Sequence, residues 1–411
     1  MQRNQVEEQR RKNRRPAVQH QAIQPPTLPA KAQRVRRYYD YSLLFAVVLI
    51  SIIGLLMIYS SSQYTAAMEH GGEAYFYAKR QAMYGGIGLG FALIFSFADY
   101  HLLLKARMIL VRLGYVVAVL LLVWTMVRGV ASHGATRWIS IAGVQFQPTE
   151  FAKGVLIVFL AAMISKLGFS VNRRDNIFRL IAYAALPTLL VMKENLSSGI
   201  ILAGITFVIL FVACRNWKWF VGLGAFGLTA VLAAKPLATL LITRFNLGRP
   251  ESYQLRRVFG WAMPERFPDD AFQTLQGLYA IGSGGFTGQG LGESIQKFGK
   301  LPEAQNDMIF SIICEELGLI GAIAIILLFV FIFYLLVQIA FEAPDLFGSL
   351  LCVGVLAHLS IQVILNIAVV TGVIPNTGVT LPFISYGGSA IVCTMVEIGI
   401  VLSVARRIRR G

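Results

Sequence analysis

Long apolar runs, separated by short polar segments, fill the chain from residue 41 to residue 405. A transmembrane helix needs about 20 mostly apolar residues, and ten runs reach or approach that length. Pro187 leaves the ends of the fifth run open, and Lys235 with Pro236 leaves open an early end to the seventh. The predicted spans are 41–60, 82–98, 108–127, 151–167, 179–192, 199–214, 219–243, 308–337, 347–371 and 388–405.

Composition places the chain in the same class. Of its 411 residues, 56% are hydrophobic and only 14% are charged. Soluble domains carry roughly 25% charged residues, so this balance is not that of a soluble domain. The sequence therefore predicts an all-α polytopic membrane protein with about ten transmembrane helices.

The net charge of +16 is concentrated in polar segments next to the apolar runs. Anionic lipid headgroups and membrane topology explain that placement better than nucleic acid does, so we expect membrane lipids, and no nucleic acid, among the partners. Residues 1–40 carry ten Lys or Arg and the helix-breaking stretch QPPTLPA, which predicts a disordered, basic, cytoplasmic tail. The four cysteines lie in or beside apolar runs, which argues against a disulfide framework.

Basic residues gather in alternate polar segments, and the positive-inside rule puts those segments in the cytoplasm. Ten spans over a membrane domain of 41–405 then place both termini there, including the basic end 406–411. The outer segment 244–307, between spans seven and eight, is too long for a simple connector. Long ordered loops usually carry function, which directs the search for a site to the outer face.

Asp307 is the last charge before the eighth apolar run, in the stretch 301-LPEAQNDMIF-310. One interpretation is structural, because the N-terminal end of a helix dipole stabilises a carboxylate. The other is functional, because an acid in a partly dehydrated cleft is a plausible general base. The dipole would lower the pKa of this carboxyl, and only dehydration would raise it toward neutral.

The stretch 145-QFQPTEFAKGVL-156 places two opposite charges at the start of a helix. Pro148 suits a first helical turn, and Glu150 and Lys153 share a face at spacing i, i+3 and can pair. Lys153 lies about one turn inside the span. It is either part of a structural ion pair or a cation that faces a cavity.

Arg137 stands beside Trp138 in 134-GATRWISI-141, on the predicted outer side. The pair is either an interfacial anchor, with the arginine on a lipid phosphate, or the source of a diphosphate clamp. The uncharged outer loop 374-IPNTGVTLPFISYGGSA-390 carries two prolines and several glycines, and we expect it to fold back toward the mouth of a cavity.

The glycine-rich segment 280-AIGSGGFTGQGLGES-294 lacks the Lys-Ser/Thr of a nucleotide loop, so we expect a tightly turning segment with close backbone approach. Glu315, Glu316 and Glu397 lie inside spans, where hydrogen bonding between helices explains them as well as catalysis does. No His, Cys or Asp cluster has the spacing of metal ligands. The sequence therefore names no cofactor and leaves only a divalent cation open.

Taken together, these stretches resemble the SEDS family, the bacterial membrane proteins FtsW, RodA and SpoVE. The resemblance covers about residues 41–405, with the motifs in the family's order. The long basic tail and the wording of the last outer loop are closer to the FtsW and SpoVE branch. The matching stretches are GATRWISI, QPTEFAK, YAIGSGGFTGQGLGES, LPEAQNDMIFSIICEELG and TGVTLPFISYGGSA.

The resemblance implies a peptidoglycan glycosyltransferase that polymerises lipid II into β-1,4 strands at the outer face of the plasma membrane, by inverting transfer with release of undecaprenyl diphosphate. It implies a class B penicillin-binding protein and other division or elongation membrane proteins as partners. Asp307 matches the family's essential loop acid and is the expected catalytic base. Arg137 and Lys153 match motif residues expected to bind the diphosphate, with Glu150 holding Lys153.

Two departures and two alternatives accompany this resemblance. Gln305 stands where the family usually has His, and Asn195 where it has an acid, so neither is given a role. A lipid II flippase would need polar groups through the whole bilayer depth, whereas the matched motifs cluster on the outer side. A non-catalytic scaffold of the division machinery is the other alternative. The sequence does not separate division, elongation and sporulation roles.

Overall fold

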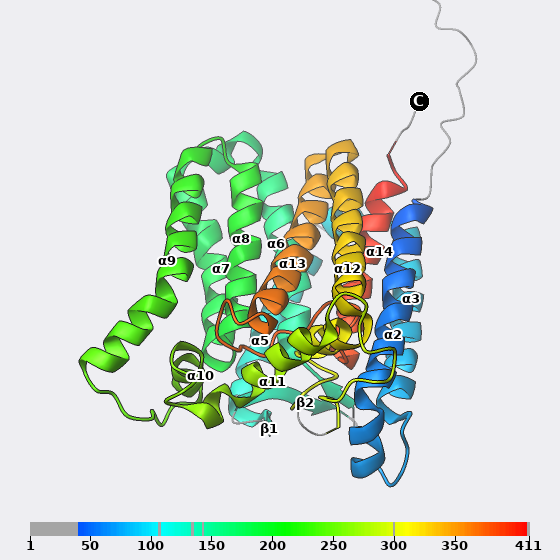
Figure 1. Ribbon diagram of the computed structural model, residues 1–411. Helices are drawn as coiled ribbons and strands as arrows, with labels where there is room; N and C mark the ends of the chain where they lie inside the picture. Colours follow the sequence, from blue (N-terminus) through cyan, green and yellow to red (C-terminus); the bar gives the residue numbers. More distant parts are fainter. Residues whose placement is uncertain (1–39, 106–107, 133–134, 142–143, 299–300, 409–411) are drawn as a thin grey trace, which may run out of the picture. The chain divides into compact units, whose positions relative to one another are not determined.

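The computed structural model describes residues 40–105, 108–132, 135–141, 144–298 and 301–408. Within these ranges, ten helices of at least 18 residues run side by side as a bundle (Figure 1). They are α2 (Tyr41–Glu69), α3 (Phe76–Phe97), α5 (Ile109–Arg128), α6 (Pro148–Leu167), α7 (Arg174–Glu194), α8 (Leu196–Ala213), α9 (Trp217–Arg244), α12 (Ile309–Glu342), α13 (Leu346–Val370) and α14 (Gly388–Ala405).

The predicted membrane fold is confirmed. Among the described helices, nine are long and apolar enough to cross a membrane, and α3 is the tenth long helix, packed along α14. The predicted seventh span, 219–243, agrees with α9, which continues past Pro236 to Arg244, and α7 likewise runs through Pro187. Thr239 and Thr243 follow Pro236 and donate their hydroxyls to carbonyls one turn back, which helps satisfy the backbone of this stretch of α9. The tail predicted over 1–40 lies outside the described residues except for Asp40.

Short elements complete one end of the bundle, the lower end in Figure 1. A three-stranded antiparallel sheet in the order β1-β2-β3 adds to the predicted helices, and Val130 pairs with Trp138 and Ile139 with Phe146. The strands are β1 (Val130–Ser132), β2 (Ala135–Ile141) and β3 (Val144–Phe146), and the helices at this end are α10 (Tyr253–Ala262) and α11 (Pro268–Gly284). Two short helices, α4 (Leu102–Lys105) and η1 (Gly168–Asn172), connect longer ones.

Local sequence explains where the long helices begin. Asn195 accepts hydrogen bonds from the amides of Ser197 and Ser198 and so caps α8. Asp345 caps α13 by accepting from the amide of Gly348 at 2.8 Å. Pro148 occupies the first turn of α6, as predicted. The helices then pack around α13, which contacts α6, α8, α12 and α14.

The two acids near the start of α12 bind different partners: Glu315 binds the end of the glycine-rich segment, and Glu316 binds α2 and Lys297, so the expected hydrogen bonding between helices is confirmed for Glu316. Glu315 accepts from the Ser294 hydroxyl at 2.5 Å and from the Ile295 amide at 3.0 Å. Glu316 accepts from the Ser60 hydroxyl at 2.6 Å and pairs with the buried Lys297 at 3.2 Å. Both carboxylates thereby join the segment before α12 to the bundle, which is a structural role.

The same segment shows the close backbone approach expected from its glycines. A Cβ on Gly284 would lie 1.9 Å from the Cys314 carbonyl oxygen, and one on Gly288 would lie 2.1 Å from the Glu316 carbonyl oxygen. The Gly290 amide donates to Glu316 O at 3.0 Å. Only glycine leaves room for these contacts.

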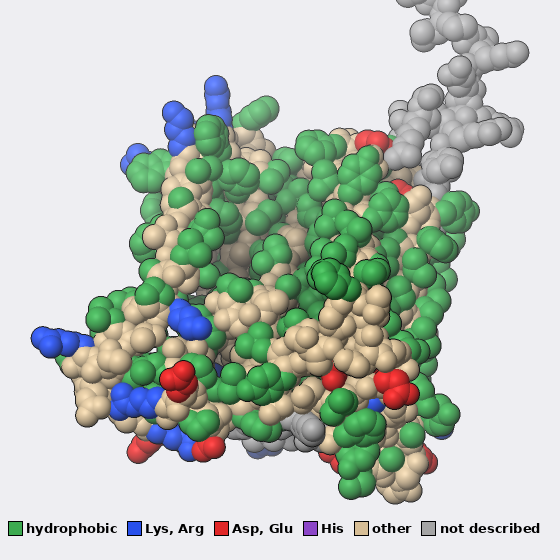
Figure 2. All heavy atoms as spheres, viewed as in Figure 1, with side chains coloured by type: hydrophobic (Ala, Val, Ile, Leu, Met, Phe, Trp, Pro, Cys, Tyr) green, Lys and Arg blue, Asp and Glu red, His purple; other side chains and the backbone are tan. Residues whose placement is uncertain are grey.

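The bundle surface matches a lipid environment. Figure 2 shows that the side of the bundle seen in Figure 1 is largely apolar along the helices, with charged side chains gathered mostly toward the ends. Large apolar side chains are exposed on α9, including Phe226, Leu232 and Leu240. An apolar surface of this extent on a soluble protein would drive aggregation.

Gly284→Ala should lower the thermal stability of the detergent-solubilised protein, because the new methyl group meets the Cys314 carbonyl. Overpacking of this kind costs about 1–3 kcal/mol. Gly282→Ala is the matched control, since it lies in the same helix and nothing stands within 4 Å of its Cβ position. Thermal unfolding of both variants is the measurement, and equal losses would contradict the close approach.

Candidate active site

Three charged side chains from distant parts of the chain meet at Gly378, between α13 and α14. A Cβ built there would lie 3.6 Å from Arg137 Nη1, 3.7 Å from Asp307 Oδ2 and 3.8 Å from Arg257 Nη1. β2 supplies Arg137, α10 supplies Arg257, and Asp307 stands two residues before α12. Gly378 has φ +66°, which glycine adopts without strain. We call these four residues the Gly378 corner.

Amide side chains hold Asp307 in place. The Asn366 side chain on α13 donates to the Asp307 carbonyl at 2.8 Å and to the Val379 carbonyl at 2.7 Å. Gln273 Nε2 donates to Asp307 Oδ1 at 3.4 Å, and Asn376 Nδ2 donates to Gln273 Oε1 at 2.6 Å. The backbone of Asp307 is therefore held tightly, whereas the hydrogen bond from Gln273 to its carboxylate is long.

Burial changes the acidity of this carboxyl. Asp307 is 5% exposed. Burial raises the pKa of Asp307 to about 7, the nearby Glu303 adds to the rise, and the positive charges of Arg257 and Arg137 oppose it. A group with a pKa near neutral can both take up and release a proton under physiological conditions, as a general base must.

Helix capping does not account for Asp307. The N-cap position of α12 is Met308, and no side-chain capping bond is found there among the described residues. Asp307 lies one residue further out, in a turn that points its carboxylate toward Gly378. A capping bond therefore does not explain this acid, the dipole interpretation stays a prediction, and burial is the largest cause of the raised pKa of Asp307.

Two guanidinium groups face the carboxylate. Arg257 stacks over the Tyr253 ring at 4.5 Å, donates to the Tyr253 hydroxyl at 2.6 Å and to the Asn376 carbonyl at 3.4 Å. Arg137 is partly buried, and its Nε has no hydrogen-bond partner among the described residues. Burial and the neighbouring Arg257 lower the pKa of Arg137. An anion placed between the two arginines would relieve this repulsion.

Glu150 and Lys153 form the predicted i, i+3 pair, at 2.8 Å, but away from the Gly378 corner. Lys153 is 1% exposed, and its ammonium also donates to Gln362 Oε1 at 2.9 Å. Of the four predicted site residues, the structure brings together Asp307 and Arg137. It places the other two in a buried cluster between α6 and α13. Direct contact of Lys153 with a diphosphate stays a prediction, and the geometry favours an internal bracing role.

Arg257 is the residue that sequence reasoning missed. It stands next to Arg256 in a loop rich in arginine, and nothing in the pattern separates the two. Arg256 donates instead to the backbone carbonyls of Pro250 and Glu251. The spacing of Tyr253 and Arg257 at i, i+4 on a short amphipathic helix is the one signal that could have indicated the stacked arginine.

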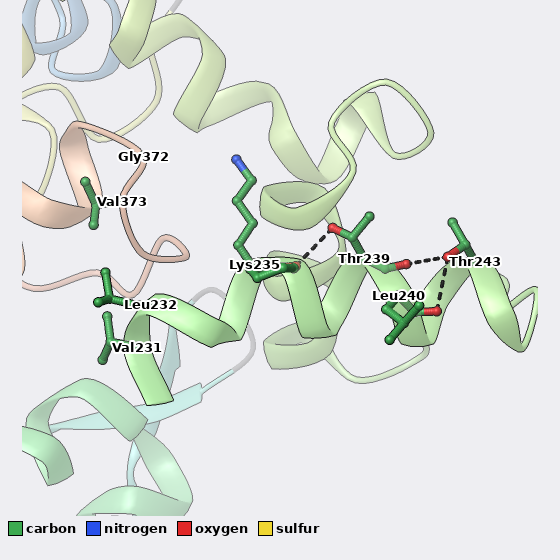
Figure 3. Close-up of a pocket in the computed structure, with 9 residues that line it drawn as sticks. Val231, Leu232, Lys235, Thr239, Leu240, Thr243, Gly372 and Val373 are labelled. Carbon is green, nitrogen blue, oxygen red and sulfur yellow. Dashed lines mark hydrogen bonds between the residues drawn. The ribbon is translucent and has the colours of Figure 1, made fainter. Parts of the chain in front are cut away.

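A groove of about 740 Å³ lies beside this corner, between α9 and the end of α13 (Figure 3). Trp261 on α10 connects the groove to the Gly378 corner. Its indole donates to the Gly372 carbonyl at 2.8 Å, and Trp261 lies one turn after Arg257. Lys235 stands 5.6 Å from the Trp261 ring. The lining, mostly aliphatic, is Val231, Leu232, Lys235, Pro236, Thr239, Leu240, Thr243, Gly372 and Val373.

In the part of the chain that the structure describes, no group of three or more His, Cys, Asp or Glu side chains could hold a metal ion. The Gly378 corner itself presents one carboxylate and two guanidinium groups.

Comparison with known proteins gives the chain a family. The family model for FtsW, RodA and SpoVE, described as cell cycle protein, matches residues 41–410. Stage V sporulation protein E of Bacillus subtilis is 36% identical over 370 residues, which cover 89% of this chain and 97% of that protein. A probable peptidoglycan glycosyltransferase FtsW of Trichlorobacter lovleyi is 34% identical, covering 89% and 93%.

Solved structures agree with this fold. A chain of a peptidoglycan synthase complex, studied for its structural coordination of polymerization and crosslinking, matches with a TM-score of 0.69 at 27% identity, covering 91% of this chain and 99% of that one. The rod shape determining protein RodA of Thermus thermophilus matches with a TM-score of 0.63 at 24% identity, covering 91% and 98%. The second likeness supports the fold alone.

The protonation of Asp307 can be followed without any assay of activity. Its pKa of about 7 lies above the ordinary value, so the carboxyl is protonated at acidic pH and ionises as the pH rises through neutrality. Infrared difference spectra between wild type and Asp307→Asn should show a protonated carboxyl that disappears with a midpoint near pH 7. A midpoint near pH 4, the value of an ordinary aspartate, would contradict the dehydrated site.

Proposed function

This chain belongs to the FtsW, RodA and SpoVE family, and from that premise we propose that it is a peptidoglycan glycosyltransferase that polymerises lipid II. One observation carries the proposal: a buried carboxylate with a pKa near 7 and two guanidinium groups meet at Gly378. That arrangement pairs a base for a sugar hydroxyl with positive charge for a departing diphosphate. Curated relatives named as peptidoglycan glycosyltransferases support it.

The proposed reaction is a single inverting displacement. Asp307 takes the proton of the acceptor hydroxyl, whose oxygen bonds to the anomeric carbon of the donor. The bond from that carbon to the diphosphate oxygen breaks, and its electron pair leaves with the lipid diphosphate. Arg137 and Arg257 stabilise the charge that develops there, and a good leaving group of this kind needs no strong general acid. A β-1,4 linkage results from an α-linked donor.

The groove beside α9 suits the lipid part of the donor. Its aliphatic lining opens toward the exposed side of α9, and Trp261 and Arg257 connect it to the corner. A polyprenyl chain in the groove would bring its diphosphate to the two arginines. Glu150 and Lys153 support this chemistry from within, by bracing α6 against α13.

The location and partners follow the same reasoning. Basic residues in alternate segments favour cytoplasmic termini, which puts the Gly378 corner at the outer face of the plasma membrane. A class B penicillin-binding protein is the proposed crosslinking partner, in line with the likeness to a chain of a synthase complex. Other division or elongation membrane proteins and the growing strand complete the partners.

A lipid II flippase is the alternative from another class. Translocation needs polar groups across the whole bilayer, whereas the cluster proposed to do chemistry lies at one end of the bundle. Polymerisation in detergent separates the two, because no translocation exists there. Glycan strands formed from purified lipid II in detergent favour the transferase.

Asp307→Asn should leave the protein folded but lower glycan synthesis from lipid II by about 10²–10⁴-fold, the usual contribution of a general base. Asp269→Asn is the control, since that carboxylate is 82% exposed and lies outside the corner. Gel analysis of strands made in detergent is the measurement. Near wild-type synthesis by Asp307→Asn would remove the assignment of the base.

Arg257→Ala should lower kcat by roughly 10²–10³-fold, as loss of one charge-stabilising donor does in other enzymes. Arg256→Ala is the matched control, because the neighbouring arginine donates to backbone carbonyls of its own loop and not to the Gly378 corner. We expect the control to stay within about threefold of wild type. Steady-state polymerisation rates check both, and equal rates for the two variants would exclude Arg257 from the site.

A further inference from the structure

A chain of five buried polar side chains crosses the interior of the bundle between α6, α13 and α14. They are Glu150, Lys153, Gln362, His358 and Glu397, each at most 6% exposed. The proposed reaction gives Glu150 and Lys153 a supporting role, but it gives no role to His358. Its Nδ1 lies 2.7 Å from Glu397 Oε2 and its Nε2 lies 2.9 Å from Gln362 Oε1.

Hydrogen bonding fixes the direction of the Gln362 amide. Gln362 Nε2 donates to the Thr380 carbonyl at 3.0 Å, so the amide oxygen faces the other way and accepts from Lys153 at 2.9 Å. Because Oε1 can only accept, the Nε2 of His358 must carry a proton. The remaining proton lies in the bond between His358 Nδ1 and Glu397, and the pair is neutral overall wherever that proton sits.

This cluster is connected to the Gly378 corner through one face of α13. His358, Gln362 and Asn366 follow each other at spacing i, i+4, i+8. Gln362 binds Thr380, and Asn366 binds both Val379 and the backbone of Asp307. The segment that carries Gly378 is thus held from α13 by two amide side chains, and His358 orients the first of them.

We propose that His358 is a positioning residue: with Glu397 behind it, it holds the Gln362 amide in the direction that clamps both Lys153 and the segment 376–380. The inference rests on the proposed glycosyl transfer, because the clamped segment faces the base and the two arginines. Without the donor at His358, Gln362 keeps only Lys153 on its Oε1 and Thr380 on its Nε2, so the amide is held less firmly and the segment shifts more readily relative to Asp307. A displacement of about 1 Å in such a site costs roughly 10²-fold in rate.

Glu397 gives the rival explanation and the means to test it. Its Oε1 has no hydrogen-bond partner among the described residues and lies 3.1 Å from the Cβ position of Gly154. If His358 only neutralised this buried carboxylate, the histidine would be dispensable once the carboxylate is gone. If His358 orients Gln362, removal of both groups leaves the amide without one of the two donors to its Oε1, and only Lys153 remains there.

The experiment compares His358→Leu with the double variant His358→Leu/Glu397→Leu, each as the full chain in detergent. We measure melting temperature, kcat and KM for lipid II, and hydrogen exchange of the amides in 376–381. His358→Leu should lose stability through the unpaired Glu397, and the double variant should recover it. In both variants kcat should be about 10- to 100-fold lower than in wild type, and KM should stay within about threefold of the wild-type value. Both should also show at least about tenfold faster exchange in 376–381.

Ser360→Ala on the same helix is the control, because that hydroxyl donates only to Ala357 within α13. It should match wild type in all three measurements. A double variant with wild-type kcat and wild-type exchange would overturn the positioning role, as would a single variant with unchanged exchange. Hydrogen exchange needs no turnover, so this inference can fail separately from the proposed function. The proposed function itself fails if polymerisation is insensitive to Asp307→Asn.

Discussion

Polar groups buried among apolar helices must find partners, and that constraint decides where the charges of this chain lie. Lys297 meets Glu316 and Ser60, and Lys153 meets Glu150 and Gln362. Each of these clusters is closed, with opposite charges in contact. Asp307 is different, because the hydrogen bond that its buried carboxylate accepts from Gln273 is long, at 3.4 Å, and no ion pair with a guanidinium group is found for it among the described residues. An incompletely paired acid of this kind is costly and therefore indicates function.

The chemistry at the end of the bundle depends on the helix at its centre. Asn366 on α13 holds both the backbone of Asp307 and the segment that carries Gly378, while the carboxylate itself stays available. Glu315 and Glu316 bind Ser294 and Lys297, and so hold the segment that precedes α12 against that helix. Rigid backbone around a loosely bonded carboxylate is the arrangement expected of a base that must accept a proton without moving.

Much of this could be predicted from the sequence, because long apolar runs and their caps are local features. The ten helices, the pair of Glu150 and Lys153, and the close approach of the glycine-rich segment were all expected and are confirmed. The roles of Arg257 and Asn366 depend on contacts between segments more than 50 residues apart, which no local pattern encodes. The small sheet was missed because two of its three strands have only three residues. The seventh span was placed correctly over 219–243, because a proline in a long apolar helix is tolerated there.

The central claim is that a dehydrated Asp307 acts as the base of sugar transfer. The most direct test is the pH dependence of kcat/KM for polymerisation of purified lipid II in detergent, which reports ionisations of the free enzyme. With the pKa of Asp307 raised to about 7, kcat/KM should rise about tenfold per pH unit below neutrality and level off above it. A rate that is constant from mildly acidic to mildly basic pH would contradict the account.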